Sequence, residues 1–144
     1  MKASKASRRI AATCRNTSAP LTILYVGHRV GDKVYSYPVT AMWDTGSTRT
    51  VVTPRLANRL ALEYVGDCSA DTANGIKDVA VFFGVYFRIG EVTFGPRSVD
   101  VTEFNSEGVE TYVDVLVGMD IISKGILTIE PSEDKHYDFS FELK

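Results

Sequence analysis

Residues 41–50 read AMWDTGSTRT, and this stretch places an acidic residue at the end of an apolar run. Ala41 and Trp43 alternate with other residues, so in a strand they share one face and Trp43 packs inward. Asp44 follows directly, and Gly46, with the most permissive backbone of any residue, comes two places later. A strand that merely ended would need no carboxylate at this point. The stretch is therefore either a turn or a reaction centre.

The rest of the chain has the pattern of short strands. Leu21, Ile23 and Tyr25 alternate with other residues at period two, which is typical of a half-buried strand. Gly31-Asp32 is a turn signal between two such strands. We expect further strands at 79–90 and 91–94, paired as a hairpin, and at 99–104 and 137–143. The sequence predicts an all-β protein.

One or two short helices interrupt this pattern. Thr53 can cap a helix, and Pro54 suits the first helical position, where its missing N–H costs nothing. An apolar stripe follows, formed by Leu56, Ala57, Leu60 and Ala61. A second helical turn is expected after Gly118, closed by Gly125.

Length and composition bound the possibilities. A chain of 144 residues, 44% hydrophobic and 24% charged, fits one globular domain. Its apolar runs fall short of the ~20 residues that a membrane helix needs, and the start lacks the apolar stretch of a secretory signal. We therefore expect a cytoplasmic protein that does not associate with membranes.

The charge is unevenly distributed. Residues 1–18 carry +5 and no acid, whereas the remainder carries −7. Because the first segment is rich in Ser, Ala and Thr, we expect 1–18 to be a disordered basic tail and 19–144 to be the domain. The tail could also touch nucleic acid, although the acidic body argues against that partner, or block assembly until it is removed.

Cysteine and histidine are too sparse for a metal site. Cys14 and Cys68 do not pair with His28 or His136 at metal-ligand spacing. We expect free thiols, no metal and no cofactor.

Two motifs together resemble a known family. The stretch DTGST at 44–48, followed downstream by LVGMDII at 116–122, is similar to the retropepsin-like aspartic proteases, and most to their bacterial and phage branch. The resemblance implies a single-domain, closed β-barrel-like acid protease fold with a polypeptide substrate. The carboxylate at Asp44 would then be catalytic, with Thr45, Gly46 and Ser47 supporting its loop.

A single Asp-Thr-Gly in the chain points to a two-fold homodimer. Hydrolysis of a peptide without metal or covalent intermediate needs both a general base and a general acid. Two carboxylates that share one proton divide these roles, as in the aspartic protease dyad itself. Asp44 from each of two copies would therefore activate the water, across an isologous interface.

Two explanations are open for Ser47. Its hydroxyl could donate to the Asp44 carboxylate and shift activity toward acid pH, or it could cap the turn locally. Two explanations are also open for Asp120, which either pairs with Arg49 or caps the short helix. Gly118 matches a close-packing position behind the catalytic loop.

The resemblance also places the substrate-binding parts. Thr72, Ala73, Asn74 and Gly75 correspond to the flap, a hairpin tip that closes over substrate. Three apolar residues would line the substrate pockets, unless they simply pack in the core: Val51, Val113 and Leu116. Asp114 would lie near that cleft and discourage acidic substrate side chains.

Strands near the two ends of the chain are expected to take part in the dimer. Strands near 20–26 and 137–143 would help to form the dimer sheet, which would cover the aromatic residues Tyr137, Phe139 and Phe141. The competing hypothesis is a catalytically silent binding or assembly module that retains the fold.

Overall fold

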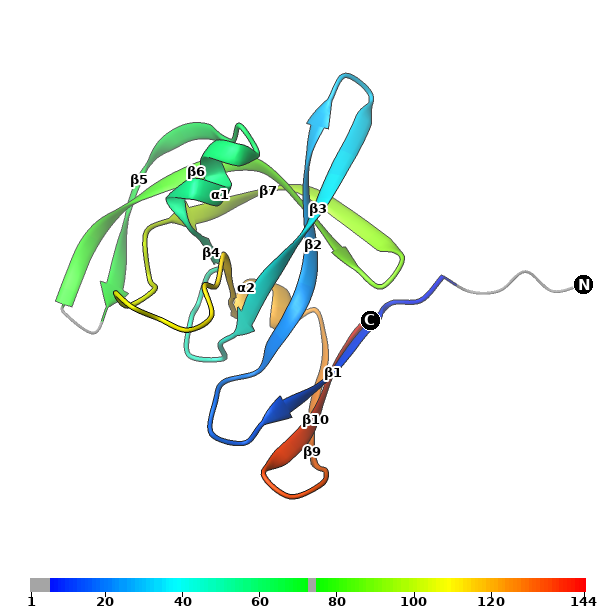
Figure 1. Ribbon diagram of the computed structural model, residues 1–144. Coiled ribbons are helices and arrows are strands. Elements are labelled where there is room, and N and C mark those ends of the chain that lie inside the picture. Colours follow the sequence, from blue (N-terminus) through cyan, green and yellow to red (C-terminus); the bar gives the residue numbers. More distant parts are fainter. Residues whose placement is uncertain (1–5, 73–74) are drawn as a thin grey trace, which may run out of the picture.

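The computed structural model describes residues 6–72 and 75–144, which form an all-β domain with two short helices (Figure 1). Six strands close into a barrel in the order β2 (Leu21–Val30), β3 (Lys33–Trp43), β8 (Val115–Val117), β4 (Val51–Val52), β7 (Val92–Val101) and β6 (Gly75–Ile89). Closure comes from the antiparallel pairing of β2 with β6. β5 (Glu63–Thr72) pairs with the first half of β6 as a long hairpin. The predicted fold class, a closed barrel with short helices, is confirmed.

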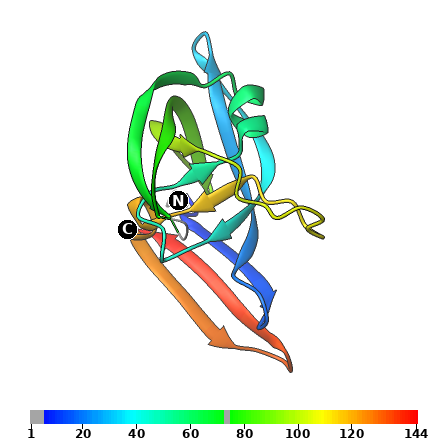
Figure 2. The same ribbon diagram turned by 90° about the vertical axis from the view of Figure 1, so that its left-hand side faces the viewer.

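Three further strands form a second sheet that projects from the barrel (Figure 2). β10 (His136–Leu143) lies at its centre, between β1 (Arg9–Arg15) and β9 (Gly125–Pro131). The prediction of a disordered tail is therefore wrong for residues 9–15. Ile10, Ala12 and Cys14 alternate at period two and turn toward the protein, with Cys14 buried. The small size of Ala12 and Cys14 masked this strand pattern in the sequence.

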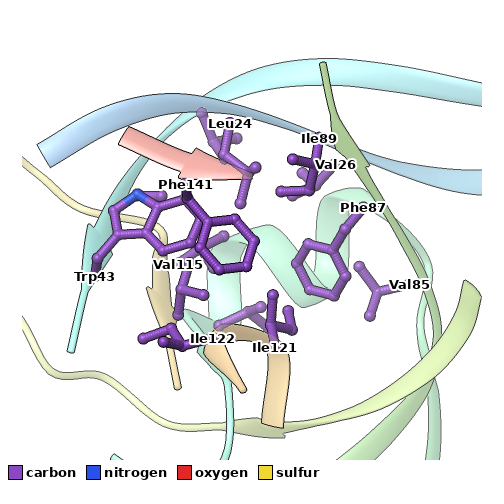
Figure 3. Close-up of a cluster of buried hydrophobic side chains, with 14 of the residues drawn as sticks. Leu24, Val26, Trp43, Val85, Phe87, Ile89, Val115, Ile121, Ile122 and Phe141 are labelled. Atoms are coloured by element: carbon purple, nitrogen blue, oxygen red, sulfur yellow. The ribbon is translucent and has the colours of Figure 1, made fainter. Parts of the chain in front are cut away.

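Trp43 connects the two sheets. Its ring centroid lies 5.2 Å from that of Phe139 and 5.0 Å from that of Phe141, both on β10. Figure 3 shows the Trp43 and Phe141 rings side by side. Its indole Nε1 donates a hydrogen bond of 2.9 Å to the Thr22 hydroxyl. The inward packing predicted for Trp43 is confirmed, since only 2% of it is exposed.

The place of β10 in a dimer sheet stays a prediction, but β10 cannot pair directly with a second copy. Both of its edges are already paired within the chain, one with β1 and the other with β9. Tyr137, Phe139 and Phe141 are buried in the core of their own subunit, because one face of β10 packs against the barrel.

The helix α1 (Pro54–Arg59) begins as predicted, with the Thr53 side chain accepting from the Leu56 N–H. The predicted stripe ends one residue early. Ala61 has a positive φ of 51° and is exposed, because it follows the helix end and closes it. Its N–H donates to Asn58, and that of Leu62 donates to Ala57, which is the Schellman pattern.

The helix α2 (Met119–Ile122) follows Gly118 as expected but ends at Ser123 rather than at Gly125. Gly125 instead begins β9, where a Cβ atom would collide with the Glu142 carbonyl. Neither helix is long and apolar enough to cross a membrane in the described part of the chain.

The hairpins agree with the sequence pattern except at one strand. The turn at Gly31-Asp32 is confirmed, with Val30 opposite Lys33. The hairpin of β6 and β7 is confirmed, but β7 continues to Val101 instead of stopping near residue 94. The separate strand expected at 99–104 is therefore wrong: its first three residues end β7, and residues 102–104 lie in the loop that leads to β8.

Candidate active site

The loop after β3 presents the Asp44 carboxylate. The Asp44 N–H donates to the Val117 carbonyl at 2.9 Å, which anchors the loop to β8. The N–H of Gly46 donates to Asp44 Oδ1 at 2.8 Å, and the N–H of Ser47 donates to the Asp44 carbonyl at 3.2 Å. Asp44 is half-buried, whereas Thr45 and Gly46 are exposed. The carboxylate is thus oriented by its own loop and remains open to solvent.

Gly118 lies directly behind this loop. A Cβ atom there would be 2.6 Å from the Arg49 carbonyl carbon and oxygen and 2.9 Å from the Ser47 oxygen. The backbones are joined by the N–H of Met119, which donates to Ser47 at 2.7 Å, and that of Asp120, which donates to Thr48 at 3.1 Å. The two sequence motifs therefore pack backbone against backbone, and any residue larger than glycine would displace the loop.

The Ser47 hydroxyl donates to the Arg49 carbonyl at 2.7 Å. It does not donate to the Asp44 carboxylate, so the structure favours local stabilisation of the turn over a direct effect on the carboxylate.

Asp120 binds Thr50 and not Arg49. Its Oδ2 accepts from the Thr50 N–H at 3.0 Å and its Oδ1 from the Thr50 hydroxyl at 2.7 Å. The same hydroxyl accepts from the Gly118 N–H at 3.1 Å. The expected Arg49–Asp120 pair is wrong, and Asp120 lies in the first turn of α2 without being its cap, which is Gly118.

Arg49 turns toward β5 and β7. Its guanidinium pairs with Asp100 at 2.9 Å and also contacts Cys68. The hydrogen bond with Cys68 raises the pKa of Arg49, partial burial opposes this, and attraction by Asp100 raises it further. Asp100 is 6% exposed, so Arg49 neutralises an acid that would otherwise be buried without a counter-charge.

A groove of about 620 Å³ opens beside the loop. Its lining combines loop residues 46–49, residues 69–71 of β5, and four residues from neighbouring strands and their ends: Val51, Val79, Asp100 and Thr102. Val51, one of the three residues predicted to line the substrate pockets, is among the lining residues of this groove. Val113 and Leu116 are not among the lining residues: Val113 is buried and its N–H donates to Asn105, and Leu116 lies in β8, opposite Val51.

The hairpin of β5 and β6 covers one side of this groove. Thr72 and Gly75 pair across it, and Ala73 and Asn74, the middle of the predicted flap, lie outside the described residues. The contribution of residues 69–71, Asp100 and Thr102 was not foreseen. Only the pairing of distant strands brings them to the loop, so no local signal marks them.

Asp114 was expected beside the cleft but lies at the start of α1. Burial alone would raise its pKa, but hydrogen bonds from Arg55 and Thr53 outweigh burial and lower the pKa. Arg55 pairs with it at 2.7 Å. Its charge is compensated there, and Asp114 is not among the residues that line the groove.

Comparisons with known proteins address the family and the fold of the chain. The sequence model of the aspartyl protease family matches residues 28–121. No curated protein matches the sequence. Among solved structures, the chain is similar to a retropepsin-like aspartic protease from Rickettsia conorii, with a TM-score of 0.55, 16% identity and 98% of each chain covered. It is less similar to the retroviral protease-like domain of Ddi1 from Leishmania major, with a TM-score of 0.40, 14% identity, and 82% of this chain and 94% of that chain covered.

The family match spans more than half of the chain and includes the first motif, at 44–48, and residues 116–121 of the second. Membership of the bacterial and phage branch stays a prediction. The chain belongs to the aspartyl protease family, and its fold is that of the retropepsin-like proteases.

Proposed function

We propose that this protein is an aspartic endopeptidase that works as a two-fold homodimer, with one Asp44 from each subunit. The observation that carries the proposal is the Asp44 carboxylate, held at 2.8 Å by the Gly46 N–H on a loop whose residues 46–49 line a groove of about 620 Å³. The carboxylate is oriented and accessible, but a single one cannot act as acid and base together.

In the proposed reaction, the ionised Asp44 takes a proton from water while the oxygen of that water attacks the peptide carbonyl carbon. The protonated Asp44 of the second subunit gives its proton to the carbonyl oxygen. The first Asp44, now protonated, then gives its proton to the amide nitrogen while the second, now ionised, takes a proton from a diol hydroxyl. The C–N bond breaks, which releases an amine and a carboxylic acid and restores the starting protonation of the pair. Two close carboxylates favour this division, because like charges at short distance hold one proton between them.

The surface around the loop supports a second copy as the partner. Thr45 and Gly46 are exposed beside Asp44, and Met119 at the start of α2 is 37% exposed. In the described part of the chain, the projecting sheet has β1 and β9 as its edges, which can add strands across a dimer. β10 itself has no free edge for such pairing.

The groove supports an extended polypeptide as the substrate. It runs between the catalytic loop and the β5–β6 hairpin, and its lining is mixed, with Val51 and Val79 beside polar residues. In this proposal the hairpin acts as a flap that closes over the peptide and excludes water.

The test is cleavage of a diverse peptide mixture from acid to neutral pH, at a concentration where dimers are confirmed. Wild type should cleave and Asp44→Asn should not, while Asp32→Asn, a matched change at the exposed β2–β3 turn, should behave as wild type. Cleavage that survives in Asp44→Asn would refute the proposal. Absence of cleavage by a confirmed wild-type dimer would favour the binding or assembly module.

A further inference from the structure

A second groove, of about 420 Å³, lies on the barrel near the end of the projecting sheet. Three main-chain bonds bring its parts together. Glu91 donates to Ser7 at 2.8 Å, Leu143 to Arg8 at 2.9 Å, and Lys144 to Lys124 at 3.1 Å. The segment before β1, the turn of β6 and β7, and the end of β10 therefore converge (Figure 1).

The lining of this groove is positively charged. Arg8, Arg97, Lys124 and Lys144 contribute to it, and none of its lining residues is acidic. Arg97 lies 4.0 Å from Asp120, whose two oxygens already accept from Thr50, and Arg8 donates to the Lys144 main-chain oxygen at 3.1 Å. Since the whole chain carries −2, this gathering of cations is a local feature.

The remaining lining is largely apolar. Val92, Phe94, Pro96 and Leu143 alternate with the basic residues around the groove. The Phe94 ring packs against Phe87 with a centroid distance of 5.9 Å, and the Arg97 guanidinium lies 5.9 Å from its centroid. Phe94 thus offers a supported apolar surface with positive charge beside it.

We propose that this groove binds an acidic polypeptide segment, one in which an apolar side chain is flanked by Asp or Glu. The apolar side chain would contact Phe94 and Leu143, while the carboxylates would pair with Lys124, Lys144 and Arg97. β4 pairs with β7 only at Asp100 and Val101, so in the described residues no strand covers that edge of β7 from Val92 to Arg97. A peptide can hydrogen-bond to such an edge.

A peptide explains the site better than a nucleic acid does. Single-stranded nucleic acids require a basic track along several nucleotides and free aromatic faces for base stacking. Here Phe94 is the one aromatic residue in the lining, so successive bases would have no second ring on which to stack. The proposal does not depend on proteolysis, because the groove is lined by none of the residues of the catalytic loop.

Fluorescence anisotropy with the full chain tests the proposal. The probes are a short labelled peptide with Leu between Asp and Glu residues, the same peptide with Lys in place of the acids, and a single-stranded DNA of equal length. Wild type should bind the acidic peptide, more weakly as salt rises. The double variant Lys124→Gln/Lys144→Gln, at two exposed positions, should bind the acidic peptide roughly tenfold more weakly, because two charge contacts are lost.

The control is Arg29→Gln/Lys33→Gln, which removes two exposed positive charges at the β2–β3 hairpin and should leave the affinity unchanged. Equal weakening in both pairs, no saturable binding of the acidic peptide, or tighter binding of the DNA would each overturn the proposal. Full displacement of the peptide by inorganic phosphate at low concentration would also overturn it, since the site would then recognise a small anion only.

Discussion

The link between Asp120 and Thr50 should stabilise the catalytic loop, and its removal is a quantitative test. Asp120→Ala removes both acceptors of Thr50, which is 1% exposed, and leaves its N–H buried without a partner. A hydrogen bond to a charged group contributes about 1.5–3 kcal/mol, and an orphaned buried donor costs about 1–3 kcal/mol. The Asp120 side chain is 22% exposed, which moderates the cost. We expect the free energy of unfolding to fall by about 2–4 kcal/mol.

Urea denaturation of a double-mutant cycle measures the link directly. Asp120→Ala combined with Thr50→Val should show a coupling energy of about 1–2 kcal/mol, whereas Asp120→Ala combined with Arg49→Ala should be additive within about 0.5 kcal/mol. Asp120→Asn retains an acceptor oxygen and should lose less than Asp120→Ala. Strong coupling to Arg49, or none to Thr50, would refute the arrangement described for this loop.

Three further outcomes are expected. Ala61→Gly should raise the free energy of unfolding by about 1 kcal/mol in urea denaturation, because φ is 51° at this position; a loss would contradict the helix ending. Hydrogen bonds from Tyr112 and then Asn105 lower the pKa of Glu103 from its ordinary value of 4.5 to about 2. The stabilisation from these hydrogen bonds should therefore be complete above pH 4.5 and be lost as the pH falls toward 2. An NMR titration with a midpoint near 4.5 would contradict this. Ser47→Ala should leave the acid limb of the pH–rate profile unmoved, since its hydroxyl donates to Arg49; an upward shift would restore the carboxylate explanation.

Local signals accounted for much of the fold. The Thr53-Pro54 pair marked the start of α1 because capping depends on residues a few positions apart. Trp43 was placed correctly because alternation in a strand fixes the face on which it lies. The strand β1 was missed although Ile10, Ala12 and Cys14 alternate, since Ala12 and Cys14 are small and the many Ser, Ala and Thr residues around them suggested a disordered tail.

The site was predictable only where the chemistry is carried by the motif itself. Asp44 and Gly46 are neighbours, so their hydrogen bond follows from the turn. The pairs Arg49–Asp100 and Thr50–Asp120 join residues that are distant in sequence. The partner of each residue depends on the element that its side chain faces. Arg49 faces β5 and β7, whereas Thr50 faces α2. The opposite charges of Arg49 and Asp120 favoured a pair that the structure does not contain.

The central claim is that two copies share one reaction centre, and a mixing experiment tests it most directly. A fixed amount of wild type is equilibrated with increasing amounts of the Asp44→Asn variant. The rate of cleavage is then measured on one peptide that wild type cleaves in the peptide mixture described above. If each site needs Asp44 from both subunits, three parts of the variant to one of wild type should reduce activity to about a quarter, because most wild-type chains then pair with an inactive partner. Activity that stays constant as the variant is added would contradict the account, since each chain would then work alone.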